Sequence, residues 1–130
     1  MGETNKTYSA KLVSATRELS AKERVAVKMF IGAEQLDELT QRDENGVLID
    51  IDYVAVVEVY NEKSDNKNYN KYVYVDKNGT MYISGSETLY RTYEEIAEEM
   101  EDEEEPWAIK VIRKESTNYK GKDFLTCMLV

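Results

Sequence analysis

The chain contains no histidine, and this absence excludes several kinds of active site. Histidine is the usual general base near neutral pH and the commonest metal ligand, so Ser-His and Cys-His nucleophiles and most zinc sites cannot be built. The sequence also lacks G-x-x-x-x-G-K-[ST] and G-x-G-x-x-G motifs, which form the common phosphate-binding loops. We therefore expect a protein that is not an enzyme and that needs no cofactor or metal.

Cysteine and long apolar runs are also scarce. The single Cys127 cannot form an internal disulfide, and a lone thiol suits a reducing compartment. No apolar run approaches the roughly 20 residues that span a bilayer, and residues 1–6 are polar, unlike a secretory signal. A length of 130 residues fits one hydrophobic core. These features predict a single cytoplasmic domain that makes no contact with a membrane.

Acidic residues outnumber basic ones by 26 to 17, but the excess is local. Residues 86–105 hold ten acidic residues and one base, Arg91, so this segment alone accounts for the net charge of −9. Two other segments are basic: residues 6–31 hold six bases against two acids, and residues 106–130 hold five against two. Because charges are screened beyond about 10 Å in ordinary salt, a basic face can coexist with an acidic one.

The N-terminal third gives mixed signals. Residues 8–13 alternate well enough for a strand. Ser20 and Glu23 have the spacing of a helix capping box, whereas residues 25–31 are rich in β-forming side chains. We predict an extended conformation for 25–31. A short helix and a long loop both fit the acidic stretch 33–45.

From residue 47 the pattern is clearer. Strands are predicted at 51–60, 71–75, 80–83, 107–113 and 123–129, with Asn78-Gly79 as a hairpin turn between the second and third. Leu89, Tyr93 and Ile96 mark one stripe of a helix over residues 86–101. The order β-β-β-α-β-β over residues 47–130 predicts a mainly β OB-fold-like five-stranded barrel with one helix, to which residues 1–46 add an N-terminal strand and connection. Other α+β sheets fit the same order.

Aromatic and basic residues are the candidates for a binding surface. Tyr72 and Tyr74 share one face of a predicted strand and would form either an exposed platform for stacked bases or part of the core. The segment 113–122 combines four bases, one aromatic ring and a glycine in a loop between the last two strands. The predicted nucleic-acid contacts are Tyr72, Tyr74, Lys110, Arg113, Lys114, Asn118, Tyr119, Lys120 and Lys122.

Four segments carry a resemblance to a known family: Lys11–Val25, Asn61–Lys67, Val75–Thr80 and Asn118–Cys127. In these segments the chain resembles the small single-stranded-DNA-binding proteins of phages and conjugative plasmids of Gram-positive bacteria. The resemblance implies an OB-type fold and sequence-tolerant binding of single-stranded DNA. We expect the protein to coat strands during replication or conjugation and to self-associate along them, with RNA as an alternative ligand. The resemblance also implies that Tyr119, Lys120 and Lys122 contact the nucleic acid.

Two other interpretations remain open. The acidic helix with Glu94, Glu95, Glu98 and Glu99 would suit a protein–protein inhibitor that mimics DNA, encoded by a mobile element. A structural subunit that binds another protein is the third interpretation. If the bases of 6–31 and 106–130 converge on one face, opposite the acidic helix, DNA binding is favoured. If they scatter, the DNA mimic is favoured.

Overall fold

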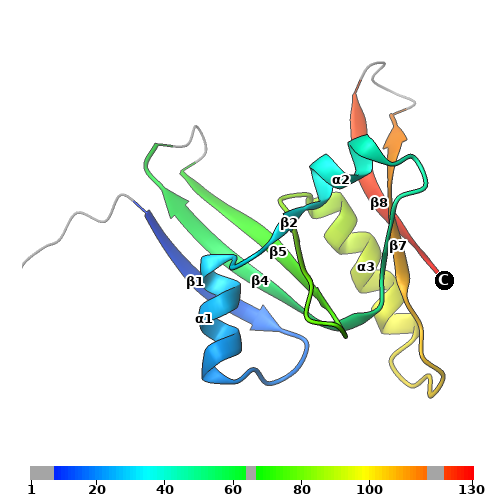
Figure 1. Cartoon of the computed structure of the whole chain (residues 1–130), viewed down its shortest axis with the longest axis horizontal. Helices are drawn as coiled ribbons and strands as arrows, with labels where there is room; N and C mark the ends of the chain where they lie inside the picture. The colour runs from blue at the N-terminus through cyan, green and yellow to red at the C-terminus, as the bar shows by residue number, and fades with distance from the viewer. Residues whose placement is uncertain (1–7, 64–66, 117–121) are drawn as a thin grey trace, which may run out of the picture.

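The structure, a computed structural model, describes residues 8–63, 67–116 and 122–130 (Figure 1). Strands make up 44% of the described residues and helices 25%, so the protein is mainly β, as predicted. No helix in the described ranges is long and apolar enough to cross a membrane. In chain order the elements are β1 (Tyr8–Ala15), α1 (Ala21–Met29), β2 (Glu34–Gln35), α2 (Leu36–Arg42), β3 (Val47–Ile49), β4 (Ile51–Asn61), β5 (Asn68–Asp76), β6 (Met81–Ser84), α3 (Glu87–Glu99), β7 (Ile109–Glu115) and β8 (Asp123–Leu129).

The strands form two sheets. The larger has the order β1-β4-β5-β6-β2, antiparallel except where the short β2 joins β6 in parallel. The smaller has the order β3-β7-β8 and is antiparallel throughout. The N-terminal strand β1 pairs with β4 along most of its length, from Tyr8 opposite Asn61 to Ala15 opposite Ala55. The N-terminal segment therefore completes one edge of the larger sheet.

One stretch of chain connects the two sheets directly. β3 pairs with β7 in the smaller sheet, and β4, which begins after a single residue, Asp50, pairs with β5 in the larger. A register shift between Ile51 and Tyr53 marks an irregularity where the strand changes sheets. The smaller sheet is thereby held beside the larger one.

The larger sheet has a buried core on each side. Val54 and Val56 of β4 face a core shared with α3 and with the inner face of the smaller sheet. Ala55 and Val57 face a second core covered by α1. In Figure 1, α1 and α3 accordingly lie on different sides of the β4–β5 hairpin. Burial on both faces explains the nearly continuous apolar run in this strand.

The prediction of an extended segment at 25–31 is wrong, because residues 21–29 form α1. The Ser20 hydroxyl accepts a hydrogen bond from the Glu23 amide at 3.2 Å, and the Glu23 carboxylate accepts one from the Ser20 amide at 2.8 Å. This capping box fixes the start of the helix, and Phe30, with φ of +53°, ends it in the left-handed region. Local capping thus outweighs the β propensity of Val25 and Val27.

The predicted elements from residue 51 onward are present. The five strands appear as β4, β5, β6, β7 and β8, and the helix appears as α3. In the β5–β6 turn the Asp76 carboxylate accepts hydrogen bonds from the amides of Asn78 and Thr80, and Gly79 takes a φ of +88°. The Asn-Gly signal therefore identified a real hairpin.

Two details of the predicted barrel are not confirmed. Residues 8–63, 67–116 and 122–130 contain three helices rather than one, because the N-terminal part contributes α1 and α2; of the two alternatives for 33–45, the short helix is observed. The strands also lie in two open sheets, in which β6 pairs with β5 and β2 while β8 pairs with β7. The large side chains of Leu89 and Tyr93 in α3 pack against the core between the sheets.

Candidate nucleic-acid interface

The outer side of the smaller sheet is the candidate site. In β7 and β8, Ile109, Val111, Leu125 and Cys127 point into the core, and alternate residues therefore point outward. We call the outward set the outer sheet face; its members are Leu48, Lys110, Ile112, Lys114, Phe124, Thr126 and Met128.

Strand register places these side chains beside one another. Lys110 pairs with Leu48 on one side and with Met128 on the other, so one row crosses all three strands. Lys114 pairs with Phe124 at the far end of the β7–β8 hairpin. Side chains directly opposite one another on neighbouring strands are about 5 Å apart at Cβ, so each lysine lies next to an apolar side chain.

The outer sheet face exposes more apolar surface than a solvated strand needs. Leu48 is 59% exposed, Met128 is 44% exposed and Phe124 is 36% exposed. A cluster of exposed large apolar side chains on one face is typical of a binding surface. Phe124 adds a flat aromatic ring, which can stack on a nucleobase.

The acidic residues of the β7–β8 hairpin lie on the face opposite to its two outward lysines. Lys110 and Lys114 point outward, whereas Glu115 and Asp123 occupy the alternate positions. Lys122, just before β8, is exposed, and its carbonyl accepts a hydrogen bond from the Ser116 amide at 2.9 Å. No acidic residue holds an outward position in the described strands of this sheet. A protein with a net charge of −9 thus carries a locally positive face.

Close approach of the chain at Gly46 supports this face. Gly46 has a φ of +84°, and a Cβ atom there would overlap the Val111 carbonyl oxygen and lie 2.7 Å from Cγ2 of Ile112. Only glycine allows the loop before β3 to pass this closely over β7. The glycine therefore helps to hold β3, with its exposed Leu48, against β7.

Arg113 is not on the outer sheet face, which corrects its predicted role. Its guanidinium donates to the Asp37 carbonyl oxygen at 2.9 Å and lies 3.5 Å from the Asp37 carboxylate and 3.9 Å from that of Asp123. The side chain is only 19% exposed. Arg113 joins the small sheet to α2, and its charge is already paired with two carboxylates.

Lys114 also borders a second surface. Together with Arg113 it lines an open hollow of about 450 Å³ whose other walls include Glu44, Glu115 and Asp123. Lys114 is exposed and forms no ion pair in the described part of the chain. It therefore lies at the border between the outer sheet face and a mixed-charge surface.

The predicted platform of Tyr72 and Tyr74 is also corrected. Both rings are buried, at 6% and 0% exposure. Tyr72 stacks on Tyr90 of α3, and Tyr74 packs edge-to-face against Tyr93 with ring centroids 5.9 Å apart. Burial raises the pKa of Tyr74 far above its usual value and that of Tyr93 to about 12. These tyrosines attach α3 to the larger sheet and cannot stack on a bound base.

Three predicted contact residues, Asn118, Tyr119 and Lys120, lie outside the described residues. Three others, Lys110, Lys114 and Lys122, are brought together at the smaller sheet. The other members of the outer sheet face were not among the predicted contacts: Leu48, Ile112, Phe124, Thr126 and Met128. Alternation in β7 and β8 pointed to Ile112 and Met128, but the pairing of Leu48 with Lys110 joins residues 62 positions apart.

The two basic segments do not converge on one face. The bases of α1, which include Lys22 and Lys28, lie on the side of the larger sheet that α1 covers. Lys110 and Lys114 lie on the smaller sheet, which packs on the opposite side of the larger sheet. The bases are thus scattered, which is the arrangement expected to favour the DNA mimic over DNA binding. Any such binding must depend on the local face alone.

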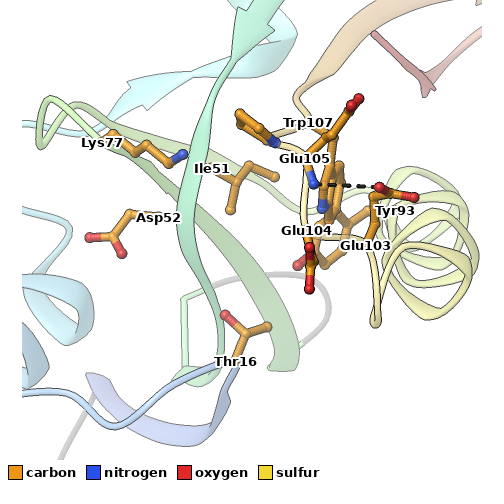
Figure 2. Close-up of a pocket in the computed structure, with 10 residues that line it drawn as sticks. Thr16, Ile51, Asp52, Lys77, Tyr93, Glu103, Glu104, Glu105 and Trp107 are labelled. Atoms are coloured by element: carbon orange, nitrogen blue, oxygen red, sulfur yellow. Dashed lines mark hydrogen bonds between the residues drawn. The ribbon is translucent and has the colours of Figure 1, made fainter.

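An acidic groove lies between α3, the following loop and the start of β4. Figure 2 shows Glu103, Glu104 and Trp107 on one side of a hollow of about 470 Å³, with Asp52 and Lys77 on the other. A neighbouring hollow of about 510 Å³ shares Thr16 and Tyr93 with it; its other walls are Tyr90, Glu94, Ala97, Glu98 and Glu101. Asp52 is paired with Arg17, at 2.9 Å. The groove as a whole combines aromatic walls with an excess of carboxylates.

The structure offers no cluster for a metal: in the ranges that it describes, no group of three or more His, Cys, Asp or Glu side chains could hold an ion. Cys127 is buried, and this burial raises its pKa to about 11, so the thiol stays protonated at neutral pH. Comparisons of the chain with protein-family models, with curated proteins and with solved structures found no match.

Proposed function

We propose that this protein binds single-stranded DNA on the outer sheet face, without reading its sequence. The observation that carries the proposal is the combination of Lys110 and Lys114 with Phe124 on a face that holds no carboxylate. Lysines can neutralise phosphates while aromatic and apolar side chains contact the bases, which is the usual way to hold a single strand. The three-stranded surface is open, as a flexible strand requires.

The resemblance seen in the sequence agrees with this proposal and extends it. It assigns the protein to the replication or transfer of a phage or conjugative plasmid, inside the cell. It also places residues 118–123, which connect to the outer sheet face through Lys122 and β8, at the nucleic acid. RNA is a second ligand of the same chemistry, because stacking and phosphate contacts occur in both.

An OB-type origin for the fold is part of the same proposal. Its support is the order β-β-β-α-β-β from residue 51, and the stretch 47–61 that pairs first with β7 and then with β5. A bent strand shared by two sheets suits a barrel that is only partly closed. On this interpretation, β1, α1, β2 and α2 are additions to the five-stranded core.

Binding of a fluorescent oligo-dT strand of about 30 nucleotides, followed by anisotropy across a salt series, tests the proposal. We expect micromolar or tighter affinity that falls with salt and is weaker for duplex DNA. The double variant K110E/K114E should lower the affinity at least tenfold and make the salt dependence shallower, because each lost phosphate contact reduces the slope by about 0.7.

The matched control is K63E/K67E, which changes the net charge equally at two exposed lysines on the β4–β5 connection. It should lower the affinity much less. An equal loss in both variants would mean that overall charge, not the outer sheet face, governs binding. No binding of oligo-dT at low salt would overturn the proposal.

A second candidate function follows from the acidic groove and from the separation of the two basic segments. Glu94, Glu98 and Glu101 face one hollow, and no ion pair among the described side chains neutralises them. Such a surface could imitate the phosphates of DNA for a basic protein. A DNA mimic would not bind oligo-dT but would release it from a basic DNA-binding protein used as a reporter, and E94Q/E98Q/E101Q would remove this effect.

A further inference from the structure

Helix α1 presents an apolar and basic surface to the solvent. Met29 is 68% exposed and Val25 is 48% exposed, one helical turn apart. Lys22 and Lys28, both exposed, flank them on the same side of the helix. We call these four residues the α1 knob. Of this helix only Val27 is fully buried, and all four residues of the α1 knob are exposed.

A second surface has the opposite character. The C-terminal half of α3 and the end of β8 enclose a hollow of about 290 Å³ with walls of Ile96, Met100 and Leu129. Glu95 and Glu99, one turn apart on α3, form its rim. Leu129 is 48% exposed although it lines the hollow, so apolar surface remains open there. We call this site the α3 hollow.

The two surfaces are complementary in charge, and both expose apolar side chains. The α1 knob projects an unbranched methionine between two lysines, and the α3 hollow offers an apolar depression beside two glutamates. Methionine adapts well to an irregular apolar gap. Ion pairs at the rim would steer the approach and fix its orientation.

The α1 knob and the α3 hollow cannot meet within one molecule. α1 packs against the core that contains Ala55 and Val57, whereas α3 packs against the core on the other side of the same sheet. Figure 1 shows α1 toward one end of the long axis of the molecule and the end of β8 toward the other. The α1 knob can therefore reach an α3 hollow only on another molecule.

We propose that the occupant of the α3 hollow is the α1 knob of a second copy of this chain. Met29 enters the hollow while Lys22 and Lys28 face Glu95 and Glu99. Because two different surfaces meet, the contact is head-to-tail, and it adds copies in a row unless the row closes into a ring. A patch of this size gives a weak contact that forms only at high protein concentration.

The contact leaves the outer sheet face uncovered. None of its members, Lys110 and Phe124 included, belongs to the α1 knob or to the α3 hollow. A row of copies could therefore present successive outer sheet faces. The inference itself does not depend on nucleic acid, and it is tested without any.

Sedimentation equilibrium of the purified chain, from about 10 μM to 1 mM in low salt, provides the test. The average mass should start near the 15.0 kDa of one chain and rise with concentration. K22E/K28E makes both surfaces acidic, and E95K/E99K makes both basic, so each variant alone should stay monomeric. Circular dichroism should show that both are folded, because all four residues are exposed.

Charge exchange makes the test specific. In an equal mixture of the two variants, the acidic knob of one faces the basic hollow of the other, so association should return to within about threefold of the wild type. One chain carrying all four changes should also associate. A wild type that stays monomeric to 1 mM, or a mixture that fails to associate, would overturn the proposal.

Discussion

The rings of Tyr72 on β5 and Tyr90 on α3 stack with their centroids 4.4 Å apart and their planes 14° apart. This contact joins the larger sheet to α3, which carries five acidic residues against one base, Arg91. It also explains why Tyr72, an attractive candidate for stacking on a base, is unavailable to a ligand. The same ring–ring attraction that would hold a nucleobase is used inside the fold.

Tyr72→Ala should consequently reduce stability rather than ligand affinity. Loss of a large buried aromatic side chain should lower the free energy of unfolding by about 3 kcal/mol, measured by urea titration. Tyr72→Phe keeps the ring and should remain within about 1 kcal/mol of the wild type. A stable Tyr72→Ala variant that had lost oligo-dT binding would contradict the burial of this residue.

Phe124→Ala should reduce ligand affinity rather than stability. The ring is partly exposed on the outer sheet face, so its removal should change the unfolding midpoint little. If it stacks on one base, the variant loses about 1–3 kcal/mol of binding, roughly 5- to 150-fold in affinity for oligo-dT. Tyr8→Ala is the matched control, since Tyr8 is an exposed aromatic residue on β1, in the other sheet. Equal effects of the two variants would argue against a specific role for Phe124.

Tyr74→Phe should stabilise the protein. The Tyr74 side chain is fully buried, and in the described part of the chain its hydroxyl has no hydrogen-bond partner. An unsatisfied buried hydroxyl costs about 1–3 kcal/mol, so replacing it with hydrogen should raise the free energy of unfolding by about 1 kcal/mol. The reference is Tyr82→Phe, where the ring is only partly buried and little change is expected. A loss of stability in Tyr74→Phe would show that the hydroxyl does have a partner in solution.

Acid should weaken the protein partly through Glu23. The hydrogen bond from Arg17, with that from the Ser20 amide, lowers the pKa of Glu23 from 4.5 to about 2. Because the folded-state pKa is the lower one, this carboxylate stabilises the fold fully above about pH 4.5, and the contribution is lost as the pH falls toward 2. In Glu23→Gln, stability should depend less steeply on pH between 4.5 and 2, as measured by urea unfolding at a series of pH values. An unchanged dependence would mean that the Arg17–Glu23 contact is not maintained in solution.

Gly46→Ala should destabilise the smaller sheet, because a Cβ there would overlap the Val111 carbonyl oxygen at a φ of +84°. Strain of this kind costs about 1–3 kcal/mol, which thermal unfolding would detect. Gly79→Ala separates the two causes, since Gly79 has a similar φ of +88° but open space around it. If both variants lost equal stability, the close approach at Gly46 would contribute nothing to the loss.

Much of the fold could be predicted from residue 51 onward, because alternation, the Asn-Gly turn and the stripe of Leu89, Tyr93 and Ile96 are local signals. The N-terminal part was harder. At residues 25–31 the β propensity of the side chains opposed a capping box, and the sequence alone did not show which would prevail. The packing of β1 against β4 joins residues about 40 to 50 positions apart and leaves no local signal.

The site was predictable only in part. Alternation placed Tyr72 and Tyr74 on one face, but it could not show that α3 covers that face. It also placed Lys110 and Lys114 together, and both lie on the outer sheet face. Arg113 is adjacent to Lys114 in sequence, so its opposite orientation follows from the strand geometry, whereas its partner Asp37 comes from a distant helix.

The two-sided burial of β4 has a consequence for how its pairing is specified. In a strand with one solvent-exposed face, a shift of the pairing by one residue turns the apolar side chains toward the solvent. The free-energy cost of this exposure protects the register. β4 would merely exchange one core for the other, since Val54 and Ala55 are equally buried. Glu58, one of two charged residues in the strand, supplies protection instead: a slip would carry it into the place of Val57 or Val59, where an unpaired charge cannot be tolerated. Glu58 thus acts as a register mark, a role that its exposed position on the strand does not reveal.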